Sequence, residues 1–437
     1  MRVLFLNHTS GIGSTGRICT DLAMQYIREG HEAIIAYGRG EVPEQYRSIS
    51  KRFGTNLDLY THVLSTRLLD HHGYASRHAT KEFLKWADHY DPDLLWLHNI
   101  HGYYINIEML FQWIKSRPNM KVKWTLHDCW AFTGHCSYFT MVKCEQWKSH
   151  CSYCVQKREY PASYLFDNCR QNFERKKAAF TGVKNMTLIT PSQWLADLVK
   201  ESFLKEYPVE VHYNTIDTSI FKPTPSDFRE KYGLHDKIIV LGVANVWHER
   251  KGLNDFLQLA RMLDDSYVIV LVGLTQKQID TLPRNIKGLV RTNSAQEFAA
   301  MYTMADIFVN PSREETFGMT TIEATACGTE AIVYEGTACE EVARTQGGIA
   351  VPPSVENLYS AITGKKYHRG VGVTNSCSML FLTRTSSVKA LAEIYTAADF
   401  FCNPTHEDNY PTTNLEAQAC GTWVITYDVG GSKETLQ

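Results

Sequence analysis

The sequence has no hydrophobic run long enough to cross a membrane and no strong excess of charge of either sign. None of its apolar segments approaches the ~20 residues that a membrane-spanning helix needs. The net charge is −2, which argues against nucleic-acid binding driven by bulk charge. The apolar segment at residues 1–7 is too short for a secretion signal, so we expect a cytoplasmic protein.

Strand and helix patterns alternate through the second half of the chain. Apolar strand patterns lie at residues 238–244, 267–273, 289–292 and 306–310, with helical patterns at 253–263 and 295–305 between them. This order predicts an α/β domain built on a doubly wound parallel sheet. Such a sheet binds ligands at the carboxyl ends of its strands, where loops enter the following helices.

Two glutamates, Glu315 and Glu323, lie eight positions apart around a glycine-containing turn. Gly318, Met319 and Thr320 lie between them and enter an apolar, helix-forming run. The free backbone N–H groups and the dipole at such a helix start favour an anion. The pattern predicts a nucleotide-sugar site, with amides for the diphosphate and carboxylates for the sugar and ribose hydroxyls. The alternative is an exposed acidic turn before a core helix.

A second anion-binding element lies upstream, where the strand pattern at 238–244 leads to Arg250 and Lys251. Arginine offers a planar fork of donors and lysine a compact charge. Between a strand and a helix, this pair is a plausible diphosphate clamp, whereas an isolated pair of this kind is usually a solvated loop.

The glycine-rich segment at 8–17 lies between the first strand pattern and a helical pattern at 18–29. A loop in this place can bring the backbone of Gly13 and Ser14 close to a phosphate or a sugar. Tight packing of the strand against the helix, with no ligand, is the alternative.

Polar residues also follow a strand pattern that ends at His127 and Asp128. A doubly wound sheet places such strand ends at its binding crevice. Either residue is therefore a candidate for contact with a sugar or an acceptor, although a histidine here can be purely structural.

Five of the twelve cysteines lie between residues 129 and 154. A cytoplasmic setting disfavours disulfides, and a Cys-x2-Cys pair with two further thiols has ligand types that suit tetrahedral zinc. We therefore expect a structural Zn²⁺ held by Cys136, Cys144, Cys151 and Cys154, with plain buried thiols as the alternative.

These motifs together resemble the retaining glycosyltransferases of family 4. The resemblance rests on the Arg250-Lys251 turn, on the spacing from Glu315 to Glu323 and on the segment at 347–353, and it spans residues 238–363. The cysteine-containing stretch that begins at His127 is similar to a subgroup from bacterial capsule, exopolysaccharide and O-antigen clusters.

The resemblance implies a fold and a set of roles. The implied fold is GT-B, in which two doubly wound, Rossmann-like parallel sheets face a cleft. Arg250 and Lys251 would grip the donor diphosphate, Glu315 would contact the transferred sugar, and Glu323 would hold the ribose. His127 or Asp128 would contact the sugar or the acceptor from the first domain.

The resemblance further implies transfer of a hexose or related sugar from a UDP- or GDP-sugar, with retention and with no metal for the chemistry. The expected acceptor is a glycan or a lipid-linked glycan intermediate of a bacterial surface polysaccharide. A basic amphipathic pattern at 168–180 would allow peripheral contact with the inner face of the membrane. A GT-B epimerase or phosphorylase is the competing enzyme class, but no convincing pyridoxal-phosphate lysine site is evident.

The predicted domain plan includes an unusual tail. An acceptor domain at 1–213, with a cysteine-rich insertion at 129–161, leads through a linker at 214–237 to a donor domain at 238–363. A junction at 364–382 precedes a partial repeat of the donor domain at 383–437, in which residues 392–427 align without gaps on residues 299–334. Asp408 replaces Glu315 and Pro411 replaces Gly318 there, so we expect the first copy to form the donor site. The alternative arrangement is that the second copy displaces the first in the sheet. The alternative function is that of a rearranged protein that binds nucleotide or sugar with impaired catalysis.

Overall fold

The computed structural model describes residues 1–290, 294–364, 387–398, 400–403, 411–426 and 435. The chain divides into two compact units, Met1–Ser376 and Cys377–Gln437. The first unit holds two large parallel sheets and the second a small one.

The first sheet forms the N-terminal domain and has seven strands in the order β3-β2-β1-β4-β5-β6-β7. Its strands are β1 (Arg2–Asn7), β2 (Glu32–Tyr37), β3 (Ser50–Arg52), β4 (Leu94–Leu97), β5 (Lys121–Thr125), β6 (Met186–Thr190) and β7 (Val209–Val211). The helices are α1 (Gly13–Arg28), α2 (Asn56–Leu69), α3 (Arg77–Tyr90), α4 (Ile107–Lys115), α5 (Cys169–Phe180) and α6 (Gln193–Glu201). Short 3-10 turns lie at η1 (Glu44–Ile49), η2 (Trp130–Phe132) and η3 (Gln146–Lys148).

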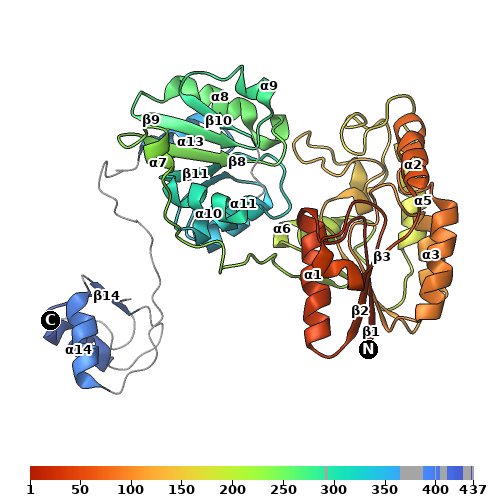
Figure 1. Ribbon diagram of the computed structural model, residues 1–437, viewed down its shortest axis with the longest axis horizontal. Helices are drawn as coiled ribbons and strands as arrows, with labels where there is room; N and C mark the ends of the chain where they lie inside the picture. Colours follow the sequence, from red (N-terminus) through yellow and green to blue (C-terminus); the bar gives the residue numbers. More distant parts are fainter. Residues whose placement is uncertain (291–293, 365–386, 399, 404–410, 427–434, 436–437) are drawn as a thin grey trace. The chain divides into compact units, whose positions relative to one another are not determined.

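Alternate residues of β1 build the core on the two faces of this sheet. Val3 and Phe5 pack in one cluster with Cys19 of α1, and Leu4 and Leu6 belong to the large cluster that includes residues of α3 and α4. Figure 1 shows α1 on one side of the strands and α3 on the other. A continuous apolar strand is therefore covered on both faces, as expected for a parallel sheet.

The second sheet has six strands in the order β10-β9-β8-β11-β12-β13. The strands are β8 (Ile238–Val243), β9 (Tyr267–Val272), β10 (Ile286–Leu289), β11 (Ile307–Asn310), β12 (Ala331–Tyr334) and β13 (Ile349–Val351). The turn η4 (Glu249–Lys251) follows β8, and the helices are α7 (Phe228–Lys231), α8 (Leu253–Met262), α9 (Gln276–Ile279), α10 (Ala295–Met304), α11 (Met319–Ala326), α12 (Ala338–Thr345) and α13 (Val355–Thr363).

The second sheet is also covered on both faces. Val240 lies in a cluster with residues of α8 and α13, whereas Ile239 and Leu241 lie in a cluster with residues of α10 and α11. The prediction of two doubly wound α/β sheets is thus confirmed. In both sheets the strand order reverses once, between β1 and β4 and between β8 and β11, and these switch points are where such sheets bind ligands.

Two elements differ from the sequence-based bounds. Helix α1 begins at Gly13 rather than at residue 18, after an extended Ile12, so Gly13 and Ser14 belong to its first turn and not to a loop. Strand β10 begins at Ile286 and not at Leu289, and it pairs in parallel with β9 from Ile269 to Val272. Residues 291 and 292 of the expected strand lie outside the described residues.

The second unit contains α14 (Val388–Ala397), β14 (Phe400–Asn403), α15 (Thr412–Ala419) and β15 (Trp423–Thr426). Its two strands pair in parallel. Most of the predicted junction at 364–382 lies outside the described residues, as does Asp408. The proposed duplication of the donor domain stays a prediction.

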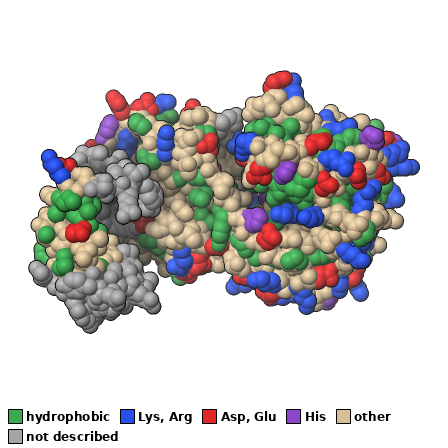
Figure 2. All heavy atoms as spheres, turned by 90° about the horizontal axis from the view of Figure 1, so that it is seen from below, with side chains coloured by type: hydrophobic (Ala, Val, Ile, Leu, Met, Phe, Trp, Pro, Cys, Tyr) green, Lys and Arg blue, Asp and Glu red, His purple; other side chains and the backbone are tan. Residues whose placement is uncertain are grey.

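The described helices include none that is both long and apolar enough to cross a bilayer. On the face drawn in Figure 2, acidic and basic side chains are interspersed rather than gathered by sign. This distribution agrees with the small net charge.

Candidate active site

The two predicted donor motifs of the second domain meet at the carboxyl end of its sheet. Lys251, at the end of η4, forms an ion pair with the carboxylate of Glu315, in the segment between β11 and α11. Burial alone would raise the pKa of Glu315, but the adjoining Lys251 and Arg250 cations hold the pKa below its usual value. Glu315 is therefore an ionised carboxylate with two cations next to it.

Arg250 is fixed by the same segment. Its Nη1 donates to the backbone oxygen of Glu314 at 2.9 Å, and its own backbone oxygen accepts from the N–H of Arg313 at 2.9 Å. Its guanidinium carbon lies 4.1 Å from the ring centre of Tyr138, which belongs to the cysteine-rich insertion. A planar cation on an aromatic face is held in a defined orientation.

Glycine is required at the starts of two helices beside this pair. Gly252 precedes α8 with a φ of +75°, and a Cβ there would lie 2.6 Å from Pro311. Gly318 precedes α11 with a φ of +88°, and a Cβ there would lie 2.6 Å from the sulfur of Cys339. Gly252 thus allows a tight entry into α8, and Gly318 allows one into α11, whose first turn begins with Met319 and Thr320.

Glu323 lies on α11, one turn beyond Thr320, and accepts a hydrogen bond from the hydroxyl of Tyr302 at 2.8 Å. Burial raises the pKa of Glu323 to about 7, and both this hydrogen bond and the charge of Arg17 act against the rise. Arg17 lies on α1, the helix that also carries Gly13 and Ser14. Gly13 and Ser14 are exposed.

His127 and Asp128 follow β5 and take part in a chain of buried polar contacts. The Nε2 of His127 lies 3.0 Å from the Nδ1 of His98, and their rings stack. Asp128 lies 3.2 Å from the Nε2 of His101 and accepts from the backbone N–H of Trp130 at 2.9 Å. His98 and His101 follow β4, the strand next to β5, at the same edge of the sheet.

Three histidines of the first domain, and Asp128, have lowered pKa values. Burial lowers the pKa of His127 to about 4 and that of His8 to about 3, and it holds the pKa of His98 well below its usual value. Burial alone would raise the pKa of Asp128, but His101 beside it keeps the pKa low. At neutral pH His8, His98 and His127 are therefore neutral imidazoles, whereas Asp128 is an ionised carboxylate.

Hydrogen bonds between residues far apart in sequence connect the segment around Glu315, in the second domain, with the first domain. Glu314 accepts hydrogen bonds from the backbone N–H of Met141 at 2.8 Å and from the hydroxyl of Thr140 at 3.2 Å. The hydroxyl of Thr316 donates to the backbone oxygen of His127 at 2.9 Å. Sequence reasoning missed Glu314 and Thr316, because nothing in the local pattern reveals a partner more than 170 positions away.

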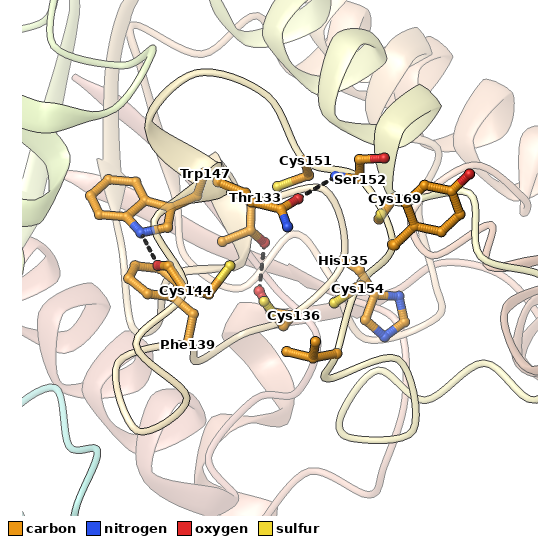
Figure 3. A pocket seen from close by; sticks show the side chains of 13 residues that line it. Thr133, His135, Cys136, Phe139, Cys144, Trp147, Cys151, Ser152, Cys154 and Cys169 are labelled. Carbon is orange, nitrogen blue, oxygen red and sulfur yellow. Dashed lines mark hydrogen bonds between the residues drawn. The ribbon is translucent and has the colours of Figure 1, made fainter.

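The predicted zinc ligands gather around one cavity. Figure 3 shows Cys136, Cys144, Cys151 and Cys154, together with Cys169, among the side chains that line it. The cavity has a volume of about 20 Å³, enough for one water molecule or ion. A hydrogen bond with Cys136 lowers the pKa of Cys154, whereas burial raises the pKa of Cys151 to about 12.

The arrangement of these thiols stops short of a metal site. Among the residues that the structure describes, no group of three His, Cys, Asp or Glu side chains has the geometry to hold a metal ion. The structural zinc stays a prediction, with one zinc per chain as the expected result of elemental analysis on protein purified without chelator. Well under one zinc per chain would leave these cysteines as buried thiols.

The two-sheet architecture has close counterparts among solved structures. The Anabaena protein HepE, solved in complex with UDP and glucose, superposes with a TM-score of 0.55 over 83% of this chain and 89% of its own, at 16% sequence identity. At this identity the likeness shows the fold, which is the GT-B fold of glycosyltransferases.

Family comparisons match nearly the whole chain in three segments. The model described as Glycosyltransferase Family 4 matches residues 15–220, and two models described as Glycosyl transferases group 1 match residues 237–364 and 375–437. The chain thus carries glycosyltransferase domains of group 1 and family 4.

Two curated relatives are named as sugar transferases. The putative colanic acid biosynthesis glycosyl transferase WcaC of Escherichia coli is 30% identical over 24% of this chain and 27% of its own length. The O-antigen chain mannosyltransferase RfbU of Salmonella typhimurium is 27% identical over 37% of this chain and 47% of its own length. The matches thus span less than half of either relative.

Proposed function

We propose that this protein transfers a hexose or related sugar from a UDP- or GDP-sugar, with retention, to a glycan acceptor in bacterial polysaccharide biosynthesis. The observation that carries the proposal is the meeting of Arg250, Lys251 and Glu315 at the entry to α11. Cations beside a helix start suit a diphosphate. The ionised carboxylate suits the hydroxyls of the transferred sugar.

The remaining roles follow from position. Met319 and Thr320, at the free N-terminus of α11, would bind phosphate oxygens, and Glu323 on the same helix would bind the ribose hydroxyls. The second group 1 match, over residues 375–437, is not preceded by an equivalent of the Arg250-Lys251 turn. We place the working donor site in the first copy.

Retention in this proposal needs no strong dedicated base. The departing phosphate oxygen would take the acceptor proton, so the positive charge of Arg250 and Lys251 on the leaving group supplies most of the stabilisation. His127 has a lowered pKa and would act as a neutral hydrogen-bonding group, while Asp128 would orient an acceptor or sugar hydroxyl. The acceptor would be a glycan or a lipid-linked glycan.

The proposal is tested by incubating the full chain with separate UDP- and GDP-sugars and measuring release of free UDP or GDP. Release from at least one sugar nucleotide, faster with a glycan acceptor, is expected, and an α-linked product from an α-linked donor would establish retention. Tight nucleotide binding with no release would favour a binding protein with impaired catalysis. Neither binding nor release would contradict the proposal.

Nucleotide affinity should depend on pH through Glu323. With a pKa of about 7, this carboxyl is mostly protonated at pH 6 and mostly ionised at pH 8, so affinity should rise about tenfold across this range. The free energy of unfolding should change in the opposite direction. A raised carboxyl pKa stabilises the folded state most at low pH, and this contribution is lost as the pH rises through about 7. Calorimetric titration of nucleotide at several pH values measures the effect, and Glu323→Gln should remove it. A pH profile unchanged by Glu323→Gln would contradict this assignment.

A further inference from the structure

A row of polar side chains lies at the carboxyl edge of the first sheet. One residue of the row follows each of four strands: Arg39 after β2, His8 after β1, His101 after β4 and Asp128 after β5. These strands are neighbours in one parallel sheet, in the order β2-β1-β4-β5, so the segments after them leave the sheet at the same edge. The row spans the switch point between β1 and β4, where a sheet of this kind binds ligands.

Arg39 is fixed to this row by its backbone and by its side chain. Its backbone N–H donates to the oxygen of His8 at 3.0 Å. A Cβ on Gly102 would lie 2.8 Å from the Cβ of His8, so His8 packs directly on the loop that carries His101. The guanidinium carbon of Arg39 lies 5.7 Å from the ring centre of Tyr103, within the range of a cation over an aromatic face.

Two tyrosines lead from Arg39 to Asp128. The rings of Tyr103 and Tyr160 meet edge to face, with their centres 6.4 Å apart. The hydroxyl of Tyr160 lies 3.3 Å from the Nδ1 of His101, and the Nε2 of this histidine lies 3.2 Å from Asp128. Tyr160 is 42% exposed, so part of it is accessible to a ligand.

Tyr103 has an unfavourable backbone conformation. Its φ is +70°, in the left-handed region that residues other than glycine rarely adopt. Such a conformation persists only where the surrounding structure imposes it, and residues of this kind cluster at ligand sites. Burial raises the pKa of Tyr103, and the charges of Arg67 and Arg39 act against the rise. The hydroxyl is therefore protonated at neutral pH and can donate to an anion.

Arg67, on α2, contacts the loop that begins at Tyr160. Its Nη1 donates to the backbone oxygen of Ala162 at 3.4 Å, and its backbone oxygen accepts from the N–H of Tyr164 at 2.7 Å. Its guanidinium carbon lies 5.4 Å from the ring centre of Tyr164. A second arginine thus contacts this loop two residues beyond Tyr160.

Neither arginine has an anionic partner within the part of the chain that the structure describes. The ion pairs there include neither Arg39 nor Arg67, and the carboxylate of the row, Asp128, is engaged by His101. Both arginines are half-buried. Because partial removal of a charge from water is unfavourable without a partner, these two guanidinium groups favour an anion from outside the chain.

We propose that this row contains a subsite for an acidic group of the acceptor, either the carboxylate of an acidic sugar or a phosphate. The subsite consists of two arginines and two tyrosines: Arg39, Arg67, Tyr103 and Tyr160. The planar fork of a guanidinium matches the oxygens of a carboxylate or a phosphate. The tyrosine hydroxyls add neutral donors.

The anion is assigned to the acceptor because the proposed function gives the donor diphosphate to other cations. Arg250 and Lys251 lie in the second domain, at the entry to α11. An acidic group bound at the subsite would lie on the side of Asp128 that carries His101 and Tyr160. The link to the acceptor rests on the proposed function, whereas the binding of an oxyanion does not.

The test is site-resolved labelling of arginine side chains by phenylglyoxal, measured by mass spectrometry on the full chain without nucleotide. The probes are glucuronate and glucose 6-phosphate, with glucose as the neutral reference. A bound probe slows labelling by a factor of 1 + [L]/Kd, so we expect at least one acidic probe to slow labelling of Arg39 and Arg67 by about threefold or more. Glucose should have no effect. Arg28, which is exposed at the last position of α1, is the control and should be labelled at one rate throughout.

A shared subsite also predicts that the two arginines depend on each other. In Arg39→Gln, the affinity of the probe that protects Arg67 should fall about tenfold, because one charged hydrogen bond is lost. Arg39→Lys keeps the charge but not the planar fork, so it should retain part of the protection. Arg28→Gln should leave the protection of Arg67 unchanged.

The outcomes separate the two kinds of anion and can overturn the proposal. Protection by glucuronate alone identifies a carboxylate, protection by glucose 6-phosphate alone identifies a phosphate, and protection by both identifies a subsite for either. Labelling of Arg39 and Arg67 that neither acidic probe slows overturns the proposal, as does protection of Arg67 that Arg39→Gln leaves unchanged. No readout involves sugar transfer. Nucleotide release by a protein with unprotected arginines would therefore remove only the subsite, and protection without release would remove only the proposed function.

Discussion

Arg250→Ala should lower kcat/KM for sugar transfer by about 10²–10³-fold, a loss of about 3–4 kcal/mol of transition-state stabilisation. The reason is that negative charge develops on the departing diphosphate, and Arg250 is held for this contact by the backbone oxygen of Glu314 and by the ring of Tyr138. Lys251→Ala should have a similar effect, because it also removes the ion-pair partner of Glu315. Both variants are assayed with the sugar nucleotide that the unchanged protein turns over best.

Two further variants test whether the loss of activity is specific to the guanidinium group of Arg250. Arg250→Lys keeps the charge but loses the planar fork, so it should recover only part of the activity. Arg261→Ala, which removes an exposed arginine of α8, should leave kcat/KM unchanged. Thermal unfolding should be measured for each variant, because Arg250 also touches Tyr138. Full activity in a folded Arg250→Ala variant would contradict the diphosphate assignment.

The sheets and the linear motifs were the most predictable features of this chain. Continuous apolar runs such as β8 and β9 have few alternatives to buried parallel strands. The short edge strands β3 and β7 carry partly exposed residues and have little pattern of their own, and neither was predicted. The family resemblance supplied roles for Arg250 and Glu323 that periodicity alone does not give.

Tertiary contacts could not be predicted from the sequence, because they depend on which distant segments come together in the fold. The bond from Glu314 to Met141 spans 173 positions, and the local sequence of neither residue indicates the other. Helix α2 shows a different limit of the sequence. Its leucines are spaced as in a helix whose apolar face packs on the core, but Leu57 and Leu64 are exposed and His62 is buried.

Glu323→Ala should weaken binding of UDP or GDP by about 10–100-fold, whereas Glu416→Ala should leave it unchanged. A hydrogen bond to a charged group contributes about 1.5–3 kcal/mol, and Glu323 lies on the helix whose entry also carries the Lys251–Glu315 pair. Glu416 has a similar local partner, since the hydroxyl of Tyr395 lies 3.4 Å from it. It is therefore a matched control that differs in lacking the upstream Arg-Lys turn.

Isothermal titration of UDP and GDP into the unchanged protein, Glu323→Ala and Glu416→Ala tests whether the donor site lies in the first copy. We expect the unchanged protein and Glu416→Ala to bind one nucleotide equally well, at one site per chain, and Glu323→Ala to bind it at least tenfold more weakly. Binding that is lost in Glu416→Ala and kept in Glu323→Ala would contradict this assignment, because it would place the donor site in residues 383–437.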